Sequence, residues 1–156
     1  LGRFGHNLAR SLRHHEAAVL GVDFDPDVVA AWHRRGHAAQ YGDAEDPELA
    51  ASLPLADARW VVCTAPRRET NLAVLRAVKE HGYAGKVALT AHHADDAEAL
   101  RAVGADLVLM PFVEAAKDAA AVLIAASGGS LPPAVAPIEH SRAEPSPLTD
   151  ATGGAT

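Results

Sequence analysis

Two glycines near the start of the chain, Gly2 and Gly5, have the spacing of the last two glycines in a G-x-G-x-x-G phosphate-binding motif. In such a loop one glycine lets the backbone approach a pyrophosphate, and the next lets the following helix pack closely on a sheet. That helix would direct backbone N–H groups and the positive end of its dipole at a phosphate. Arg3, between the glycines, either adds a charge-assisted contact or faces solvent. We expect the first glycine and strand of the motif to precede Leu1.

A carboxylate follows where such a motif would hold a ribose. Residues 17–23 form a short apolar run that ends in Asp23, which predicts a buried parallel strand. Asp23 lies 18 residues after Gly5, near the roughly 20-residue offset at which a carboxylate accepts hydrogen bonds from a ribose 2′-OH. The alternatives are a strand-end carboxylate that faces solvent and a turn residue ahead of Asp25-Pro26.

The elements that must position these residues alternate as βαβ units do, which predicts an α/β fold with a doubly wound, parallel sheet. Asp25 is predicted to cap a helix that starts at Pro26 and ends at Gly36, and Gly82 is predicted to end a later helix. The predicted helices span about 5–15, 26–35, 47–53, 71–78, 95–103 and 111–126, and the predicted strands span about 17–23, 37–41, 59–64, 86–91 and 106–110.

Charge and composition narrow the functional classes. The chain has 14 Lys and Arg against 20 Asp and Glu, a net charge of −6, and no basic block, so no nucleic-acid partner is expected. A single cysteine, Cys63, predicts no internal disulfide and is expected in a strand. The segment is expected to be soluble, because no apolar run approaches the roughly 18 residues of a membrane span and the start does not resemble a signal peptide.

The nine histidines do not predict a metal site. His14-His15 and His92-His93 are adjacent pairs, and the side chains of neighbouring residues diverge on a helix or a strand. No set of four ligands is completed by a cysteine or carboxylate at ligand spacing. His92-His93 follow a predicted strand, so one of them either touches a ligand or senses pH, or both are surface residues.

The composition changes after residue 126. Residues 127–156 are rich in Pro, Ser, Thr and Gly and have no hydrophobic periodicity. We interpret them as a disordered tail or linker, which leaves residues 1–126 as one folded domain.

Several local motifs occur in one order along the chain. They are Gly2 with Gly5, Val22-Asp23, Asp25-Pro26, Tyr41-Gly42-Asp43-Ala44, Val61-Val62-Cys63-Thr64, Asn71-Leu72, the segment from Leu100 to Asp106, and Met110-Pro111. In this order they resemble the N-terminal domain of the regulator of potassium conductance family, RCK_N, also called TrkA-N. The resemblance covers roughly residues 1 to 124 and is greatest to the domains of cation:proton antiporters and glutathione-gated potassium efflux systems.

The resemblance implies a Rossmann-like fold that binds NAD(H), AMP, ADP or ATP. It implies a homodimer whose movement gates a membrane-embedded cation transporter or channel, fused upstream or separate, at the cytoplasmic face of the membrane. It places adenine at Asp43 and Ala44, and a phosphate wall at Thr64 and Ala65; the alternative for Gly42-Asp43 is a tight turn with an Asx hydrogen bond. The implied cofactor-binding residues are Gly2, Arg3, Phe4, Gly5, Asp23, Phe24, Asp43, Ala44, Thr64 and Ala65.

Two further expectations depend on the strand order. In a 3-2-1-4-5-6 sheet the strand preceding Leu1 would lie between those ending at Asp23 and Thr64, so this chain should leave a gap there. Arg67 and Arg68 open a predicted helix, where cations are unfavourable. They either face solvent or meet an anion such as phosphate or a neighbouring subunit's carboxylate, while Asn71 is expected to pack or hydrogen-bond inside the domain.

The main competing class is an NAD(P)-dependent oxidoreductase, which uses the same nucleotide fold. An oxidoreductase needs acid–base residues beside the nicotinamide, from a substrate domain or lid. No Tyr-x-x-x-Lys pair is present, because Tyr41 precedes Glu45 and Tyr83 precedes Val87 at that spacing. We therefore expect no enzymatic activity; an interaction module with an empty nucleotide site is the third class.

Overall fold

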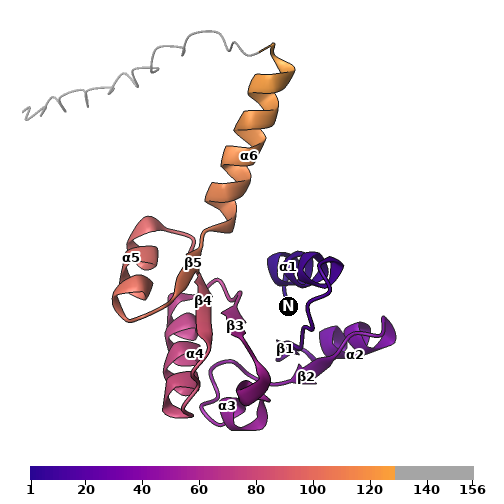
Figure 1. Cartoon of the computed structure of the whole chain (residues 1–156), viewed down its shortest axis with the longest axis vertical. Helices are drawn as coiled ribbons and strands as arrows, with labels where there is room; N and C mark the ends of the chain where they lie inside the picture. The colour runs from indigo at the N-terminus through magenta and orange to yellow at the C-terminus, as the bar shows by residue number, and fades with distance from the viewer. Residues whose placement is uncertain (129–156) are drawn as a thin grey trace, which may run out of the picture.

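The computed structural model describes residues 1–128, in which helices and parallel strands alternate (Figure 1). The helices are α1 (Arg3–His14), α2 (Pro26–Arg34), α3 (Leu49–Ser52), α4 (Arg68–Glu80), α5 (Ala94–Ala102) and α6 (Pro111–Ala126), and η1 (Leu55–Asp57) is a short 3-10 helix. The strands are β1 (Gly21–Asp23), β2 (Ala39–Tyr41), β3 (Trp60–Cys63), β4 (Lys86–Thr90) and β5 (Leu107–Leu109). The predicted α/β order is confirmed. Most of the predicted tail, residues 129–156, lies outside the described residues.

The strands form two parallel sheets rather than one. β1 pairs with β2, and β3, β4 and β5 form a second sheet in that order. Within residues 1–128, β1 and β3 do not pair with each other, so the predicted gap between the strands ending near Asp23 and Thr64 is present. β1 is shorter than predicted, because its ladder to β2 starts only at Gly21, opposite Ala39.

The hydrophobic core belongs to the larger sheet. β4 is its central strand, and residues 87–90 of that strand are all buried. The core side chains come from this sheet, the residue that follows β4, and the helices α4 and α5: Cys63, Leu75, Val78, Val87, Leu89, Ala91, Ala97, Leu100 and Val108. The smaller sheet packs on Trp32 of α2, which is buried against Gly21.

The predicted helix boundaries have identifiable local causes. The side chain of Asp25 caps α2 by accepting a hydrogen bond of 2.9 Å from the Asp27 amide, and Pro26 is the first helical residue. Gly36 and Gly82 follow α2 and α4 with φ of 73° and 71°, a left-handed conformation that glycine adopts at little cost. Both helix ends are therefore where the sequence predicts them.

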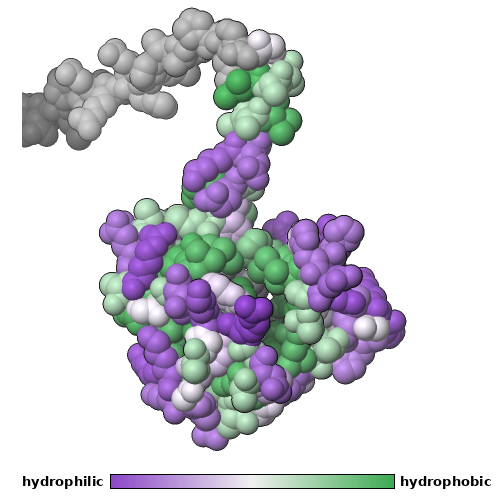
Figure 2. Space-filling model, viewed as in Figure 1, coloured by the Kyte–Doolittle hydropathy of each residue, from purple (hydrophilic) through white to green (hydrophobic). Residues whose placement is uncertain are grey.

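The helix α6 projects away from both sheets (Figure 1). None of its residues is buried, and its large apolar side chains include Val122, Leu123 and Ile124. Figure 2 shows that apolar surface gathers at the far end of α6, while polar surface covers the end nearer the sheets. Within residues 1–128, every helix is too short or too polar to cross a membrane.

Candidate functional site

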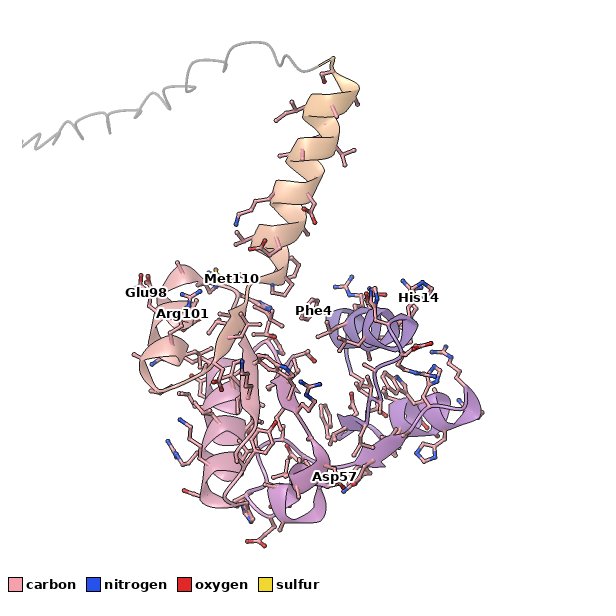
Figure 3. The ribbon with its side chains drawn as sticks, viewed as in Figure 1. Phe4, His14, Asp57, Glu98, Arg101 and Met110 are labelled. Atoms are coloured by element: carbon pink, nitrogen blue, oxygen red, sulfur yellow. The ribbon has the colours of Figure 1, made fainter. Side chains whose placement is uncertain are left out.

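The predicted phosphate loop opens α1 directly. Gly2 is the N-cap residue, its carbonyl accepts a hydrogen bond of 2.9 Å from the His6 amide, and no side chain of residues 1–128 caps the helix. The first amides of a helix have no acceptor within the helix, so they are available to an anion. Arg3 is exposed beside them. Figure 3 shows Phe4 at the end of α1 nearer the larger sheet and His14 at the opposite end.

The two glycines of the loop differ in what surrounds them. Gly5 is buried, and a Cβ there would lie 2.7 Å from Thr64 Oγ1, just beyond the end of β3. A Cβ on Gly2 would meet no atom of the described residues within 4 Å, and its φ of −59° suits any residue. The lack of a side chain at Gly5 thus serves the packing of α1 on β3, while neither packing nor conformation requires a glycine at position 2.

Asp23 ends β1 beside this loop, with its side chain only 9% exposed. Its Oδ1 accepts a hydrogen bond of 2.9 Å from the Asp25 amide, which fixes the carboxylate. Its Oδ2 is contacted by the backbone nitrogen of Leu1. The structure thus brings the proposed ribose carboxylate to the start of the phosphate loop.

The loop after β2 lies next to the end of β1. The Gly42 amide donates to the Asp23 carbonyl at 3.0 Å, which places Asp43 beside the proposed ribose position. Asp43 is exposed, and its Oδ1 accepts a hydrogen bond of 2.9 Å from the Glu45 amide. This is the Asx turn that the sequence offered as the alternative. Asp43 Oδ2 accepts no hydrogen bond from any described residue.

The loop at residues 2–5 and the loops after β1, β2 and β3 lie together, and we call them the ring of loops. The last predicted contacts flank this ring of loops. Thr64 and Ala65 are half-buried at the end of β3, and the Ala65 carbonyl accepts from Asn71 Nδ2 at 2.9 Å. Phe24 is 68% exposed and leaves its ring accessible. The contacts from Leu1 to Asp23, from Gly42 to Asp23 and from Gly5 to Thr64 therefore bring the predicted loops together.

Asn71 is the buried polar centre behind the site. It is fully buried, its Nδ2 also donates to the Arg67 carbonyl at 2.8 Å, and its Oδ1 accepts from the Thr90 amide at 3.1 Å. The Thr90 hydroxyl in turn donates to the Cys63 carbonyl at 2.8 Å. The prediction that Asn71 hydrogen-bonds inside the domain is confirmed.

The sequence interpretation missed Glu45. Its Oε1 accepts hydrogen bonds from Arg67 Nη2 at 2.9 Å and from Thr70 Oγ1 at 2.7 Å. Arg68 lies 3.8 Å from the Asp96 carboxylate. Both arginines are exposed, as the solvent alternative predicts, and each also meets a carboxylate of its own chain, which the sequence interpretation did not anticipate. The signal was present, because two cations at a helix N-terminus favour an acidic partner.

A hollow lies elsewhere, between α1 and α2. Its volume is about 750 Å³, and it contains none of the predicted site residues. Arginine and histidine dominate its lining, which consists of His6, Asn7, Arg10, Ser11, Arg13, His14, Trp32, Arg35 and His37. Arg13 Nη1 contacts His37 Nδ1 there. This hollow is cationic and separate from the ring of loops.

The side chains of Cys63 and His92 could in principle react, but both are packed against other groups of the fold. Burial raises the pKa of the Cys63 thiol above its ordinary value and outweighs the lowering effect of a backbone hydrogen bond from Ala65. A buried, protonated thiol is a poor nucleophile. His92 packs edge-on against Phe112, with ring centroids 5.1 Å apart.

Comparison with known proteins decides the family. The model of the TrkA-N domain matches residues 1–111. The chain belongs to the TrkA-N domain family. The likeness extends over the phosphate loop, Asp23 and both sheets, so the TrkA-N match includes every predicted site residue.

Relatives of this TrkA-N domain include transport proteins. The glutathione-regulated potassium-efflux system protein KefC of Escherichia coli O139:H28 (strain E24377A / ETEC) is 32% identical over 80 residues, which are 51% of this chain. The matched region spans only 13% of the length of KefC.

Solved structures share the fold. The NAD(P)-binding domain of an exopolyphosphatase-related protein from Archaeoglobus fulgidus is 25% identical with a TM-score of 0.67, covering 78% of this chain and 90% of that one. The Kef C-terminal domain of Shewanella denitrificans, in its AMP-bound form, is 19% identical with a TM-score of 0.70, covering 83% of this chain and 78% of that one. The fold is therefore that of Rossmann-like nucleotide-binding domains.

Proposed function

We propose that this TrkA-N domain is a nucleotide-sensing regulatory domain that gates the transport of potassium or another monovalent cation, through cation:proton antiport. Its ligand is NAD(H) or an adenine nucleotide, AMP, ADP or ATP. It acts without enzymatic activity at the cytoplasmic face of the membrane, as the folded domain of residues 1–126. Membership of the TrkA-N family and the likeness to KefC support this proposal.

The observation that carries the nucleotide assignment is the open space at Gly2. Neither a positive φ nor a neighbouring atom among the described residues requires glycine there. A glycine that lets the protein backbone approach a phosphate accounts for this position, because a Cβ would occupy the space that the phosphate needs. The amides at the start of α1, which no side chain of the described residues caps, begin at the same place.

We assign the other contacts of the nucleotide, those to its ribose, adenine and phosphates, from the ring of loops. Asp23 accepts from the ribose hydroxyls through Oδ2, the carboxylate oxygen that the Leu1 backbone nitrogen contacts in this structure. Asp43 accepts from the exocyclic amine of adenine through Oδ2, while Oδ1 stays in the Asx turn. Thr64 and Ala65 wall the phosphates on the side of the larger sheet.

Sensing requires two arrangements with different nucleotide affinity, because a ligand shifts an equilibrium only through that difference. We place the second arrangement in a homodimer, whose partners touch through helices near the site and act on a membrane-embedded transporter. The exposed apolar end of α6 projects away from the site and offers a second, separate surface for a dimer. Light scattering on the full chain at high concentration tests this, and a strict monomer would count against it.

Thermal unfolding of the full chain with NADH, AMP, ADP or ATP tests the ligand class. A nucleotide that binds only the native state stabilises it by mass action and so raises the melting temperature. When the nucleotide concentration is 100 times Kd, the free energy of unfolding increases by about 2.7 kcal/mol. Asp23→Ala should reduce this gain. Asp57→Ala is the matched control, because Asp57 lies in η1, away from the phosphate loop (Figure 3). No shift with any of the four ligands would refute the sensor.

A further inference from the structure

Glu45 connects three groups around the proposed adenine position. Its amide donates to Asp43 Oδ1 at 2.9 Å, so its backbone orients that carboxylate. Its own carboxylate accepts from Arg67 Nη2 at 2.9 Å and from Thr70 Oγ1 at 2.7 Å. One residue therefore holds Asp43 through its main chain and the start of α4 through its side chain.

This connection joins the two sheets. Asp43 and Glu45 follow β2 of the smaller sheet, whereas Arg67 is the N-cap of α4 and Thr70 lies in the first turn of α4, beside the larger sheet. β1 and β3 are not hydrogen-bonded to each other within residues 1–128, so the spacing of the two loops depends on contacts such as this one. The loop that carries Asp43 is thereby fixed relative to Thr64.

Stability alone gives a weak reason for the arrangement. The Arg67 and Glu45 side chains are 64% and 47% exposed, and ion pairs exposed to this degree contribute little, because water screens them. Thr70 is different, since it is buried and its hydroxyl finds its acceptor in Glu45. The fixed direction of the Glu45 side chain is thus better explained by the position it gives to the loop.

We propose that Glu45 is a positioning residue that sets Asp43 to recognise the exocyclic amine of adenine, and so determines the preference for adenine over hypoxanthine nucleotides. The inference rests on the proposed nucleotide site. Adenine carries an amine donor at C6, which Asp43 Oδ2 accepts. Hypoxanthine carries a carbonyl there, which would face the carboxylate as a second acceptor. Adenine makes this hydrogen bond to a charged group and hypoxanthine cannot, so adenine should be preferred by a factor on the order of ten or more.

The experiment measures Kd for AMP and for IMP by calorimetry on the full chain. Wild type should prefer AMP about tenfold or more, and Asp43→Asn should reduce that preference. Glu45→Ala should bring the AMP-to-IMP ratio toward one and also lower the melting temperature, because the buried Thr70 hydroxyl loses its acceptor. Glu45→Gln keeps an acceptor oxygen for Thr70 and Arg67, so it should recover most of the preference.

Two further variants separate positioning from folding. Arg67→Gln alters an exposed partner only, and should lower the AMP-to-IMP ratio in the same direction as Glu45→Ala. Glu48→Ala is the control, since Glu48 is an exposed carboxylate of the same connection. An unchanged ratio in both Glu45→Ala and Arg67→Gln, with wild type binding AMP, would overturn the positioning role and leave the nucleotide site standing. Failure of wild type to bind either nucleotide would refute the site itself.

Discussion

Gly5 and Thr64 meet across the break between the two sheets. A Cβ at position 5 would lie 2.7 Å from Thr64 Oγ1 and 3.5 Å from Thr64 Cβ. Gly5 belongs to α1, which leads into β1, while Thr64 directly follows β3 of the larger sheet. In the absence of a ladder between β1 and β3, this close packing helps to hold the phosphate loop against the larger sheet.

Gly5→Ala should therefore destabilise the fold. Alanine favours a helix by up to about 1 kcal/mol over glycine, whereas overpacking a tight contact costs about 1–3 kcal/mol. Threonine is stiff at χ1 and cannot simply rotate away. We expect a net loss of about 1 kcal/mol in the free energy of unfolding, measured by urea titration. In a Thr64→Ala background, Gly5→Ala should cost little stability. An equal loss from Gly5→Ala in wild type and in that background would contradict the contact.

Gly2→Ala should affect nucleotide binding much more than stability. Its backbone conformation suits alanine, and the added Cβ meets no described atom within 4 Å, so the free energy of unfolding from urea titration should fall only by the roughly 0.5–1 kcal/mol that separates alanine from glycine at an N-cap. Nucleotide affinity should fall about tenfold or more, because the methyl group takes the space of a phosphate. Calorimetry with AMP measures this change. Unchanged affinity would mean that the phosphate lies elsewhere.

The order of the elements and the break in the sheet were predictable from local patterns. A short apolar run ending in Asp23, the Asp25-Pro26 cap and the glycines after α2 and α4 each act within a few residues, and the structure confirms them. The break followed from the glycine motif. In the 3-2-1-4-5-6 order of a Rossmann sheet, the strand expected between β1 and β3 would precede Leu1.

Contacts between distant residues were not predictable in the same way. Glu45 meets Arg67 and Thr70 only because the loops after β2 and β3 converge, and no local pattern encodes that distance. The exposure of α6 was equally hidden, since its mostly apolar sequence, charged at Glu114, Lys117 and Asp118 alone, would suit a buried helix. The cationic hollow between α1 and α2 also depends on tertiary packing, which brings Arg13 to His37.

Asn71→Leu, in the helix α4, should be among the most damaging substitutions in the core around the larger sheet. It removes two donors and one acceptor from a fully buried position, and leaves the Thr90 amide without that partner. Each buried group left unsatisfied costs about 1–3 kcal/mol, so we expect a total loss of about 3 kcal/mol or more. Asn7→Leu is the control, because Asn7 is exposed on α1 and should change stability by less than about 0.5 kcal/mol. Similar losses in the two variants would show that the Asn71 hydrogen bonds contribute little.

Cys63 should be protected in the native state at alkaline pH. Its burial raises the pKa of the thiol, so the reactive thiolate is scarcer than for an exposed cysteine whose pKa is about 8.5. At pH 8 an aromatic disulfide reagent should react slowly with the folded chain and quickly in urea. The stability contributed by keeping the thiol neutral is present in full below about pH 8.5 and is lost as the pH rises through the higher folded-state pKa. Rapid labelling without urea, at the rate of the unfolded chain, would show that the end of β3 opens readily and that the contacts of Thr64 and Asn71 do not hold it closed.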